Sequence, residues 1–328
     1  MRIDSGQFVV VCMVKNGEYF MKEFIRHYTQ LGAQHIVFVD NGSTDQTVPI
    51  AMQASNVSVL QCLLPAKRYE TDMRRYAAQV FCRGGWCLFA DIDEFMDYPG
   101  RDTATMKDIL DYLNINEYSA VVGQLVDMYP MSKISESDGL PGSGDFLRSH
   151  CYYETEGIEL IGYHADNNPY TYFLHSNRVS ETKISCAFGG VRGRVFGTNN
   201  GLTKHPLVKV VQGVTPSTHP HCSSGVYCAD FTVLLKHYKF AGDFAERIKK
   251  QVAASAWDHG EDEIYLQRVK EESPVLYYPG KSKSYISAEK AMDGHFLLAS
   301  NRYLEWVGKG RSNDINCKSK HYGQSGVL

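Results

Sequence analysis

An acidic cluster follows directly on a short apolar stretch in the first third of the chain. Residues 86–90 read Trp-Cys-Leu-Phe-Ala after a Gly-Gly break, and Asp91-Ile92-Asp93-Glu94 comes next. Such an apolar run is typical of a buried parallel strand, and open α/β sheets bind ligands at the carboxyl ends of their strands. Side chains i and i+2 of an extended chain face the same side, about 7 Å apart. Asp91 and Asp93 can therefore share one hard cation.

A single Asp-x-Asp pair also occurs by chance in a chain of this size, so a solvated strand end is the competing interpretation. The two interpretations differ in what must surround the pair. A ligand site at a sheet edge needs further strands that end there with polar residues of their own, whereas a solvated strand end needs none. The segments before residue 91 supply such strands.

The composition describes a globular protein with enough apolar residues for a large core. The chain has 328 residues, 43% of them apolar, and a formal net charge of −3. Lysines and arginines are dispersed, which argues against a nucleic-acid-binding face. No segment approaches the ~20 apolar residues of a membrane span, and we expect no signal peptide. Nine cysteines, mostly in apolar surroundings, fit free thiols in a reducing compartment, so we expect a cytoplasmic protein.

Two strand-turn units open the chain. Residues 8–13 form an apolar run that ends in Lys15-Asn16-Gly17, and a helical pattern from Glu18 closes at Gly32. Residues 35–39 form a second strand that ends in Asp40-Asn41-Gly42-Ser43-Thr44-Asp45. This polar run either binds a ribose or base edge, or it is a turn with a helix cap. The sequence leaves both open, and Pro49 favours a helix that starts near Thr47.

Further alternation follows up to the acidic cluster. Residues 57–62 form a third strand candidate, and residues 69–82 a helix with one apolar face. If Arg74 and Arg75 of this helix have no role in a site, they are solvated charges. Four strand-helix alternations in under a hundred residues predict an α/β fold with a doubly wound, mostly parallel sheet flanked by helices.

The second half is less periodic. After a helix at 106–113 and a strand at 120–126, residues 131–145 form a long loop, either a lid or acceptor gate or an insertion without a role. Arg192 and Arg194 lie in a Gly-rich stretch that suits oxyanion or sugar recognition. Helices are expected at 244–252, capped by Asp243, and from about Glu261, and the last eighteen residues are expected to fray.

Taken together, these residues resemble glycosyltransferases of the family 2 type, which have the GT-A fold. The resemblance rests on an ordered set: Lys15-Asn16 after the first strand, the run 40–45, and Asp91-Ile92-Asp93-Glu94. Further stretches resemble one bacterial branch of that family, and they are Gly189 to Gly197, Leu202 to Val208, Ser217 to His219 and Leu234 to Phe240. The match spans residues 8–245.

The resemblance implies roles for individual residues. Asp40 would contact the nucleotide, and Asp91 and Asp93 would hold Mn²⁺ or Mg²⁺ on the donor diphosphate, where the cation stabilises the leaving group. The remaining donor-binding candidates are Lys15, Asn16, Asn41, Arg75, Ile92, Arg192 and Lys239. An inverting mechanism also needs a carboxylate base beside the acceptor hydroxyl, for which Asp127, Glu181, Glu261 and Asp262 are all candidates.

Two Asp oxygens and two phosphate oxygens leave an octahedral ion in need of further ligands. We therefore expect one of His219 and His237 to complete the metal or diphosphate shell, although a lone histidine is more often structural. The expected organisation is a nucleotide-sugar-binding half at 1–130, an acceptor-side half at 131–245 within the same GT-A domain, and a C-terminal helical extension at 246–328.

The sequence thus predicts a metal-dependent glycosyltransferase for polysaccharide biosynthesis. It would move a sugar from a nucleotide donor, most simply a UDP-sugar, to a glycan or lipid-linked acceptor, in the cytoplasm or at the inner face of the membrane, without nucleic-acid partners. Two rival classes remain. A non-catalytic nucleotide- or glycan-binding protein would keep the fold, and an Asp-x-Asp phosphatase would use Asp91 as a nucleophile. The phosphatase motif stands near the N-terminus and precedes Gly or Thr, unlike the motif here.

Overall fold

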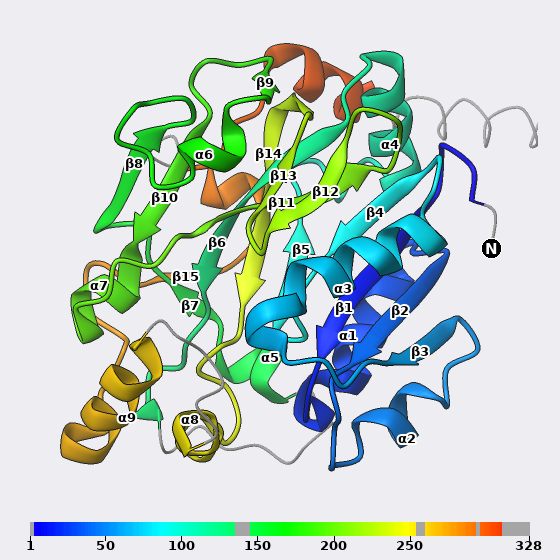
Figure 1. Ribbon diagram of the computed structural model, residues 1–328. Helices are drawn as coiled ribbons and strands as arrows, with labels where there is room; N and C mark the ends of the chain where they lie inside the picture. Colours follow the sequence, from blue (N-terminus) through cyan, green and yellow to red (C-terminus); the bar gives the residue numbers. More distant parts are fainter. Residues whose placement is uncertain (1–2, 135–144, 254–259, 293–295, 310–328) are drawn as a thin grey trace, which may run out of the picture.

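The computed structural model describes residues 3–134, 145–253, 260–292 and 296–309 (Figure 1). Most of the expected loop at 131–145 and the last eighteen residues lie outside this range. Within the described ranges, no helix is both long enough and apolar enough to cross a membrane.

The N-terminal part alternates strands and helices. The elements are β1 (Phe8–Val14), α1 (Glu18–Leu31), β2 (His35–Asp40), α2 (Thr47–Ala51), β3 (Val57–Gln61), α3 (Ala66–Phe81) and β4 (Trp86–Phe89). β1 pairs in parallel with both β2 and β4, and β2 pairs in parallel with β3. These four strands therefore direct their carboxyl ends to one edge of the sheet.

The second half of the sheet is mixed. Its strands are β5 (Glu94–Asp97), β6 (Ala120–Asp127), β11 (Thr203–Lys209) and β14 (Tyr227–His237), and the order of the sheet is β3-β2-β1-β4-β11-β6-β14-β5. β11 is antiparallel to both neighbours, β4 and β6, whereas β14 runs parallel to β6. β6 and β14 therefore end at the same edge as β1, β2 and β4.

Shorter elements complete the chain. They are α4 (Met106–Ile115), α5 (Asp145–Ser149), β7 (Tyr152–Tyr153), β8 (Ile158–Gly162), α6 (Thr171–Leu174), β9 (Arg178–Val179), β10 (Ser185–Gly189), α7 (Gly190–Phe196), β12 (Thr215–His219), β13 (Cys222–Ser224), α8 (Phe244–Ala253), α9 (Glu261–Glu272), β15 (Lys283–Ser284), a 3₁₀ turn at Glu289–Ala291, and helical residues 301–309. β9 joins the main sheet through β14.

Alternate residues of β1 bury opposite faces of the sheet. Val10 and Cys12 pack in a cluster with α1 residues such as Phe24, whereas Val9 and Val11 pack in a second cluster with Met73 of α3. This is the two-faced burial that a parallel strand requires. A third cluster joins α7, α8 and α9, which lie together at one end of the molecule (Figure 1).

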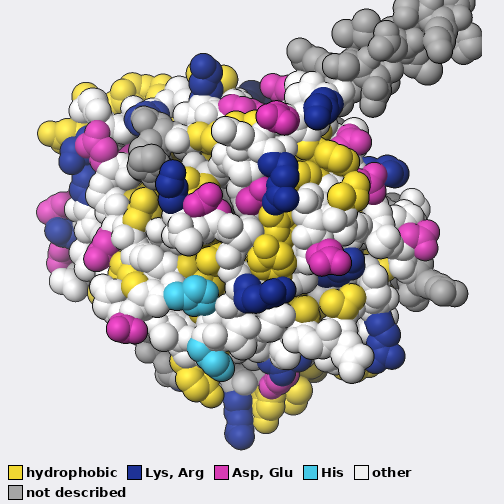
Figure 2. Space-filling model, turned by 90° about the horizontal axis from the view of Figure 1, so that it is seen from above, with side chains coloured by type: hydrophobic (Ala, Val, Ile, Leu, Met, Phe, Trp, Pro, Cys, Tyr) yellow, Lys and Arg dark blue, Asp and Glu magenta, His cyan; other side chains and the backbone are white. Residues whose placement is uncertain are grey.

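The predicted fold class is confirmed: the molecule is α/β, with a large, mostly parallel sheet flanked by helices. The helix near Thr47 begins where Pro49 favours it, and Ser43 accepts a hydrogen bond from the Asn16 backbone. The helix expected at 69–82 begins earlier, at Ala66, because Pro65 directly precedes its first turn. Figure 2 shows one face of the molecule, on which acidic, basic and hydrophobic side chains are interspersed.

Candidate functional site

Six of the described strands, β1, β2, β3, β4, β6 and β14, run parallel and end at one edge of the sheet, and four of these ends carry residues of the candidate site. Asp40 closes β2, Asp127 closes β6, His237 closes β14, and the Asp91–Glu94 turn follows β4. In the register of the parallel β6 and β14, His237 lies opposite Asp127. The backbone pairing therefore brings together two side chains that are 110 positions apart in sequence.

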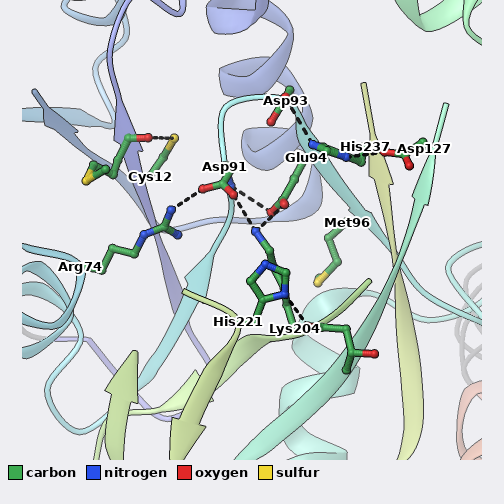
Figure 3. A network of polar contacts seen from close by, with 12 residues as sticks. Cys12, Arg74, Asp91, Asp93, Glu94, Met96, Asp127, Lys204, His221 and His237 are labelled. Atoms are coloured by element: carbon green, nitrogen blue, oxygen red, sulfur yellow. Dashed lines mark hydrogen bonds and ion pairs between the residues drawn. The ribbon is translucent and has the colours of Figure 1, made fainter. Parts of the chain in front are cut away.

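Asp91 lies between two basic side chains (Figure 3). Its Oδ1 accepts a short hydrogen bond from Arg74 of α3, and its Oδ2 accepts one from Lys204 Nζ of β11 at 2.6 Å. Lys204 also donates to Glu94 Oε1 at 2.5 Å, and Glu94 Oε2 accepts from the Asp91 backbone amide at 3.1 Å. Both Asp91 oxygens are thus engaged by cations of the chain itself.

The charges in this cluster set its protonation. Burial alone would raise the pKa of Asp91, but Arg74 and Lys204 outweigh it and hold the pKa well below its usual range. Burial and the Asp91 charge raise the pKa of Glu94 against the opposing pull of Lys204. Burial would lower the pKa of Lys204, but the two carboxylates raise it. Asp91 and Lys204 are therefore charged at neutral pH.

A second polar chain starts at Asp93. Its Oδ2 lies 3.4 Å from His237 Nε2, and His237 Nδ1 lies 2.7 Å from Asp127 Oδ1. The other Asp127 oxygen accepts from Arg192 Nε at 2.7 Å. The order is Asp93, His237, Asp127, Arg192, and the first three are visible in Figure 3.

The two carboxylates favour a charged imidazole. Burial would lower the pKa of His237, but Asp93 and Asp127 raise it to about 9. Burial would raise the pKa of Asp127, but Arg192 and His237 lower it to about 2. When Nδ1–H donates to Asp127, the Nε2 atom faces the Asp93 carboxylate, and a proton or a metal cation between them removes the repulsion.

This arrangement fits a cation that arrives with a ligand. Asp93 and His237 offer one carboxylate and one imidazole, and Asp127 fixes the ring as carboxylates commonly do for metal-binding histidines. Across the described parts of the chain, no group of three or more His, Cys, Asp or Glu side chains is placed to hold a metal ion. A cation here would therefore need oxygens from a bound substrate.

A cavity of about 590 Å³ opens beside both clusters. Its lining includes these residues of the predicted site: Asp91, Arg192, His219, His237, Lys239, Glu261 and Asp262. It also includes Lys204 and Glu94 from the central cluster, and Lys67 and Arg68 from the first turn of α3. The structure thus gathers residues from four distant parts of the chain around one cavity.

Other predicted residues lie apart from the cavity lining. Asp40 is 1% exposed and accepts hydrogen bonds from the Gly42 and Ser43 amides, so it shapes its own turn. Asn41 donates to the Cys62 and Leu64 carbonyls, and Asn16 accepts from the Thr44 amide. Lys15 is exposed at the end of β1.

Three more predicted residues make contacts outside the cavity. Arg75 donates to the Pro216 and Ser217 carbonyls and so ties α3 to β12. Ile92 packs against the core, and Glu181 accepts a hydrogen bond from the Lys183 amide in a turn. His219, by contrast, lines the cavity, and it lies in an aromatic cluster with Tyr170 and Phe173, whose ring centroids are 5.3 and 4.8 Å from its own.

Three residues of the central cluster, Arg74, Glu94 and Lys204, are not among the predicted site residues. The alternative that Arg74 is a solvated charge is wrong, because the residue is 3% exposed and paired with Asp91. One signal was available: Arg74 is three and four positions before the buried Ala77 and Ala78, which places it on the apolar face of α3. Lys204 stands in a stretch noted for its resemblance, but β11 had no assigned position in the sheet.

Sequence comparison finds one partial similarity and no matching family model. A stretch of 112 residues, 33% of this chain, is 32% identical to a glycosyltransferase family 92 protein of Oryza sativa subsp. japonica. The match covers 19% of that protein, so the chain spans about a fifth of the length of this relative.

Among solved structures, two similar chains are a glucosyl- and a mannosyl-3-phosphoglycerate synthase. Glucosyl-3-phosphoglycerate synthase from Mycobacterium tuberculosis, solved with Mn²⁺, UDP and phosphoglyceric acid, is 15% identical, with 44% of this chain and 50% of that chain covered and a TM-score of 0.26. Mannosyl-3-phosphoglycerate synthase from Rubrobacter xylanophilus is 17% identical, with 40% and 45% covered and a TM-score of 0.28.

Proposed function

We propose that this protein is a metal-dependent, inverting glycosyltransferase of the GT-A type. It would move a sugar from a nucleotide donor, a UDP-sugar, to a glycan or lipid-linked acceptor in polysaccharide biosynthesis. The observation that carries the proposal is the facing pair of Asp93 and His237, 3.4 Å apart, of which His237 lines a 590 Å³ cavity together with acidic and basic side chains. The partial similarity to a family 92 glycosyltransferase supports the same reaction class.

Asp93 and His237 are the residues that would hold Mn²⁺ or Mg²⁺. When bound, the cation would neutralise charge on the departing diphosphate. Asp127 holds the His237 ring through Nδ1 and so aims Nε2 at Asp93. Asp91 has a different role in this proposal. Arg74 and Lys204 engage both of its oxygens, so Asp91 holds these two side chains in place instead of binding the metal directly.

Among the four candidate bases, Asp262 fits best. Asp127 has both oxygens engaged by Arg192 and His237, and its pKa of about 2 makes it a poor proton acceptor at neutral pH. Glu181 lies in a turn outside the cavity lining. Asp262 and Glu261 line the cavity from the first turn of α9, and Asp262 is an electrostatic neighbour of Lys239. We assign the removal of the acceptor proton to Asp262.

The nucleoside would lie along the ends of β1 and β2. The turn after β2 is rigid because Asp40 accepts from two of its amides and Asn41 holds two carbonyls beyond β3. Lys15 and Asn16 follow β1 at the same edge. In this proposal Asp40 acts on the nucleotide through the shape of the turn, with Lys15 and Asn16 contacting the ligand. In this proposal the diphosphate of the donor would lie next to the nucleoside, near Asp91.

A nucleotide-sugar screen tests this function. We expect one UDP-sugar to release UDP slowly in the presence of Mn²⁺ and without acceptor. Asp93→Asn should lower that rate at least 100-fold, because the cation loses its only carboxylate ligand from the chain. Asp111→Asn is the matched control, since Asp111 pairs with Lys107 on the exposed side of α4, and it should not change the rate.

The screen also separates the rivals. A non-catalytic binding protein would bind UDP without releasing it from any UDP-sugar. A phosphatase would release inorganic phosphate from a phosphate monoester and would lose this activity in Asp91→Asn. If Mn²⁺ changes neither UDP affinity nor UDP release in the unsubstituted protein, the proposed metal-dependent transfer is wrong.

A further inference from the structure

Arg192 is a buried cation that uses only part of its hydrogen-bonding capacity. The residue is 6% exposed, and its Nε donates to Asp127 at 2.7 Å. Neither Nη group has a hydrogen-bond partner in residues 3–134, 145–253, 260–292 or 296–309. The Nη atoms are not among the fully enclosed polar atoms without a partner. Because Arg192 lines the cavity, these atoms face the cavity. A guanidinium held in this way presents two donors in a fixed plane.

Lys239 adds a second cation to the same wall. It lines the cavity, and its ammonium lies over the ring of Tyr265, 5.1 Å from the centroid. In the described parts of the chain it forms no ion pair within 4 Å. Glu261 and Asp262 at the start of α9 line the cavity too, and Asp262 acts electrostatically on Lys239. An ammonium placed beside an aromatic ring keeps its capacity to bind an anion.

The donors of this wall are not all used within the described residues. Arg192 and Lys239 contribute two positive charges. The carboxylate hydrogen-bonded to Arg192, that of Asp127, is shared with His237, and Glu261 and Asp262 are electrostatic neighbours of the two cations. Burying a cation without a full set of partners is costly, and a fork of donors matches a carboxylate or phosphate well. The missing partner is therefore an anion that enters through the cavity.

We infer that Arg192 and Lys239 form a site for one anionic group, a carboxylate or a phosphate, that the substrate carries in addition to the donor diphosphate. The inference rests on the proposed function. Arg192 lies beyond Asp127 from the Asp93 and His237 pair, which is where the diphosphate would bind. Lys239 is close to Asp262, beside which the acceptor hydroxyl must lie. The anion therefore belongs either to the transferred sugar or to the acceptor.

The experiment first fills the diphosphate region with UDP and Mn²⁺ at saturating concentration. Calorimetric titration then follows with glucose 6-phosphate and glucuronate as anionic probes and glucose as the neutral probe. We expect at least one anionic probe to bind at a one-to-one ratio and at least tenfold more tightly than glucose. Arg192→Gln and Lys239→Gln should each weaken that binding at least tenfold and change UDP affinity less than twofold.

Matched controls come from exposed cations on neighbouring helices. Arg268→Gln in α9 and Lys249→Gln in α8 remove the same charges outside the cavity, and probe binding should not change. A parallel comparison of UDP-glucuronate with UDP-glucose locates the anion. A tenfold preference for UDP-glucuronate that disappears in Arg192→Gln places it on the transferred sugar, and binding of a free probe beside UDP places it on the acceptor.

Three results would overturn the inference. The first is equal binding of anionic and neutral probes in both formats, and the second is an equal loss of probe binding in the control variants. The third is a loss of UDP affinity in Arg192→Gln and Lys239→Gln that matches the loss of probe binding, because the pair would then belong to the diphosphate. If UDP itself does not bind, the proposed function fails, and titration of the nucleotide-free protein with glucose 6-phosphate still tests the anion site.

Discussion

Helix α7 carries two arginines, two positions apart, that are used in opposite ways. Arg194 donates from Nε and Nη2 to Glu154 at 2.9 and 2.6 Å and to the Leu276 carbonyl at 2.6 Å, and Glu154 also accepts from Tyr129. Among the residues that the structure describes, Arg192 makes one hydrogen bond, to Asp127. Both face buried carboxylates, since Glu154 is 3% and Asp127 5% exposed.

The difference separates a structural pair from a binding pair. The Arg194 network is complete within the protein and ties α7 to the segment around Leu276, so it contributes to stability. The Arg192 network ends at the cavity wall, where the Nη donors of Arg192 have no partner among the described residues. Two residues that look interchangeable in a Gly-Gly-Val-Arg-Gly-Arg stretch are thus distinguished by the completeness of their hydrogen bonds.

The largest expected effect comes from breaking the complete network. Arg194→Met leaves the Glu154 carboxylate buried with only a neutral tyrosine hydroxyl, which should lower the free energy of unfolding by about 3 kcal/mol. Arg192→Met should cost less, because Asp127 keeps its protonated His237 partner. Urea denaturation of both variants measures the two values. Equal losses of unfolding free energy would show that the two arginine–carboxylate pairs contribute equally to stability.

A pH titration probes a third buried network, around His205. Its Nδ1 accepts from the Ser223 amide at 3.0 Å and its Nε2 lies 2.8 Å from the Tyr163 hydroxyl, so the ring is neutral and Nε2 carries the proton. Burial lowers the pKa of His205 to about 4. Stability from this neutral ring is present above the unfolded pKa of about 6.5 and is lost as the pH falls towards 4, by roughly 3 kcal/mol in total.

His205→Asn provides the comparison for that titration. The variant is expected to be less stable at neutral pH, but its free energy of unfolding should change less steeply with pH. The slope between pH 6 and 5 should be smaller by up to about 1.4 kcal/mol per pH unit, the value for one proton. Parallel slopes for the two proteins would show that His205 takes up no proton in this range on unfolding.

Asp127→Asn tests the shared carboxylate at the cavity. Loss of the residue that orients a metal-binding histidine typically costs about 10- to 100-fold in metal affinity. We expect the Mn²⁺ concentration needed for half-maximal UDP binding to rise by that factor, while UDP binding without metal is unchanged. Glu154→Gln is the control, because it alters a buried arginine pair without contact to His237. If the Mn²⁺ concentration for half-maximal UDP binding rises equally in Glu154→Gln, Asp127 has no specific role in metal binding.

The smallest effect is expected for an exposed pair. Arg268 lies 3.6 Å from Glu272 on α9, with 44% and 66% of their side chains exposed. Solvent screens such pairs, so Arg268→Gln should change the free energy of unfolding by less than about 0.5 kcal/mol. The same urea experiment measures it. A loss comparable to that of Arg194→Met would mean that the number of hydrogen bonds does not explain the difference within α7.

The sequence predicted the parallel half of the fold because its signals are local. Apolar runs such as residues 8–13 and 35–39, each followed by a polar turn, are sufficient to predict strands that end at one sheet edge. The insertion of β11 between β4 and β6 has no local signal, since it depends on pairing between residues that are 79 or more positions apart.

The same limit applies to the candidate site. Asp91 and Asp93 could be found from their spacing, but their different partners could not. Asp91 meets Lys204 because β11 pairs with β4, and Asp93 meets His237 because β14 pairs with β5 and β6. Whether a carboxylate faces a fixed lysine or a histidine is decided by strand order, which composition and periodicity do not contain.

The position of β11 also sets the order in which the protein can assemble during synthesis. β4 is made early, but its second neighbour in the sheet is Thr203–Lys209, and the partner of Asp93 is at residue 237. Until β11 has been made, one edge of β4 has no paired strand, and Asp91 lacks its partner Lys204. Long-range pairings of this kind fold slowly and leave intermediates prone to association. The charged residues of the site are thus completed only after His237 has been synthesised, which makes early release of truncated products a source of aggregation.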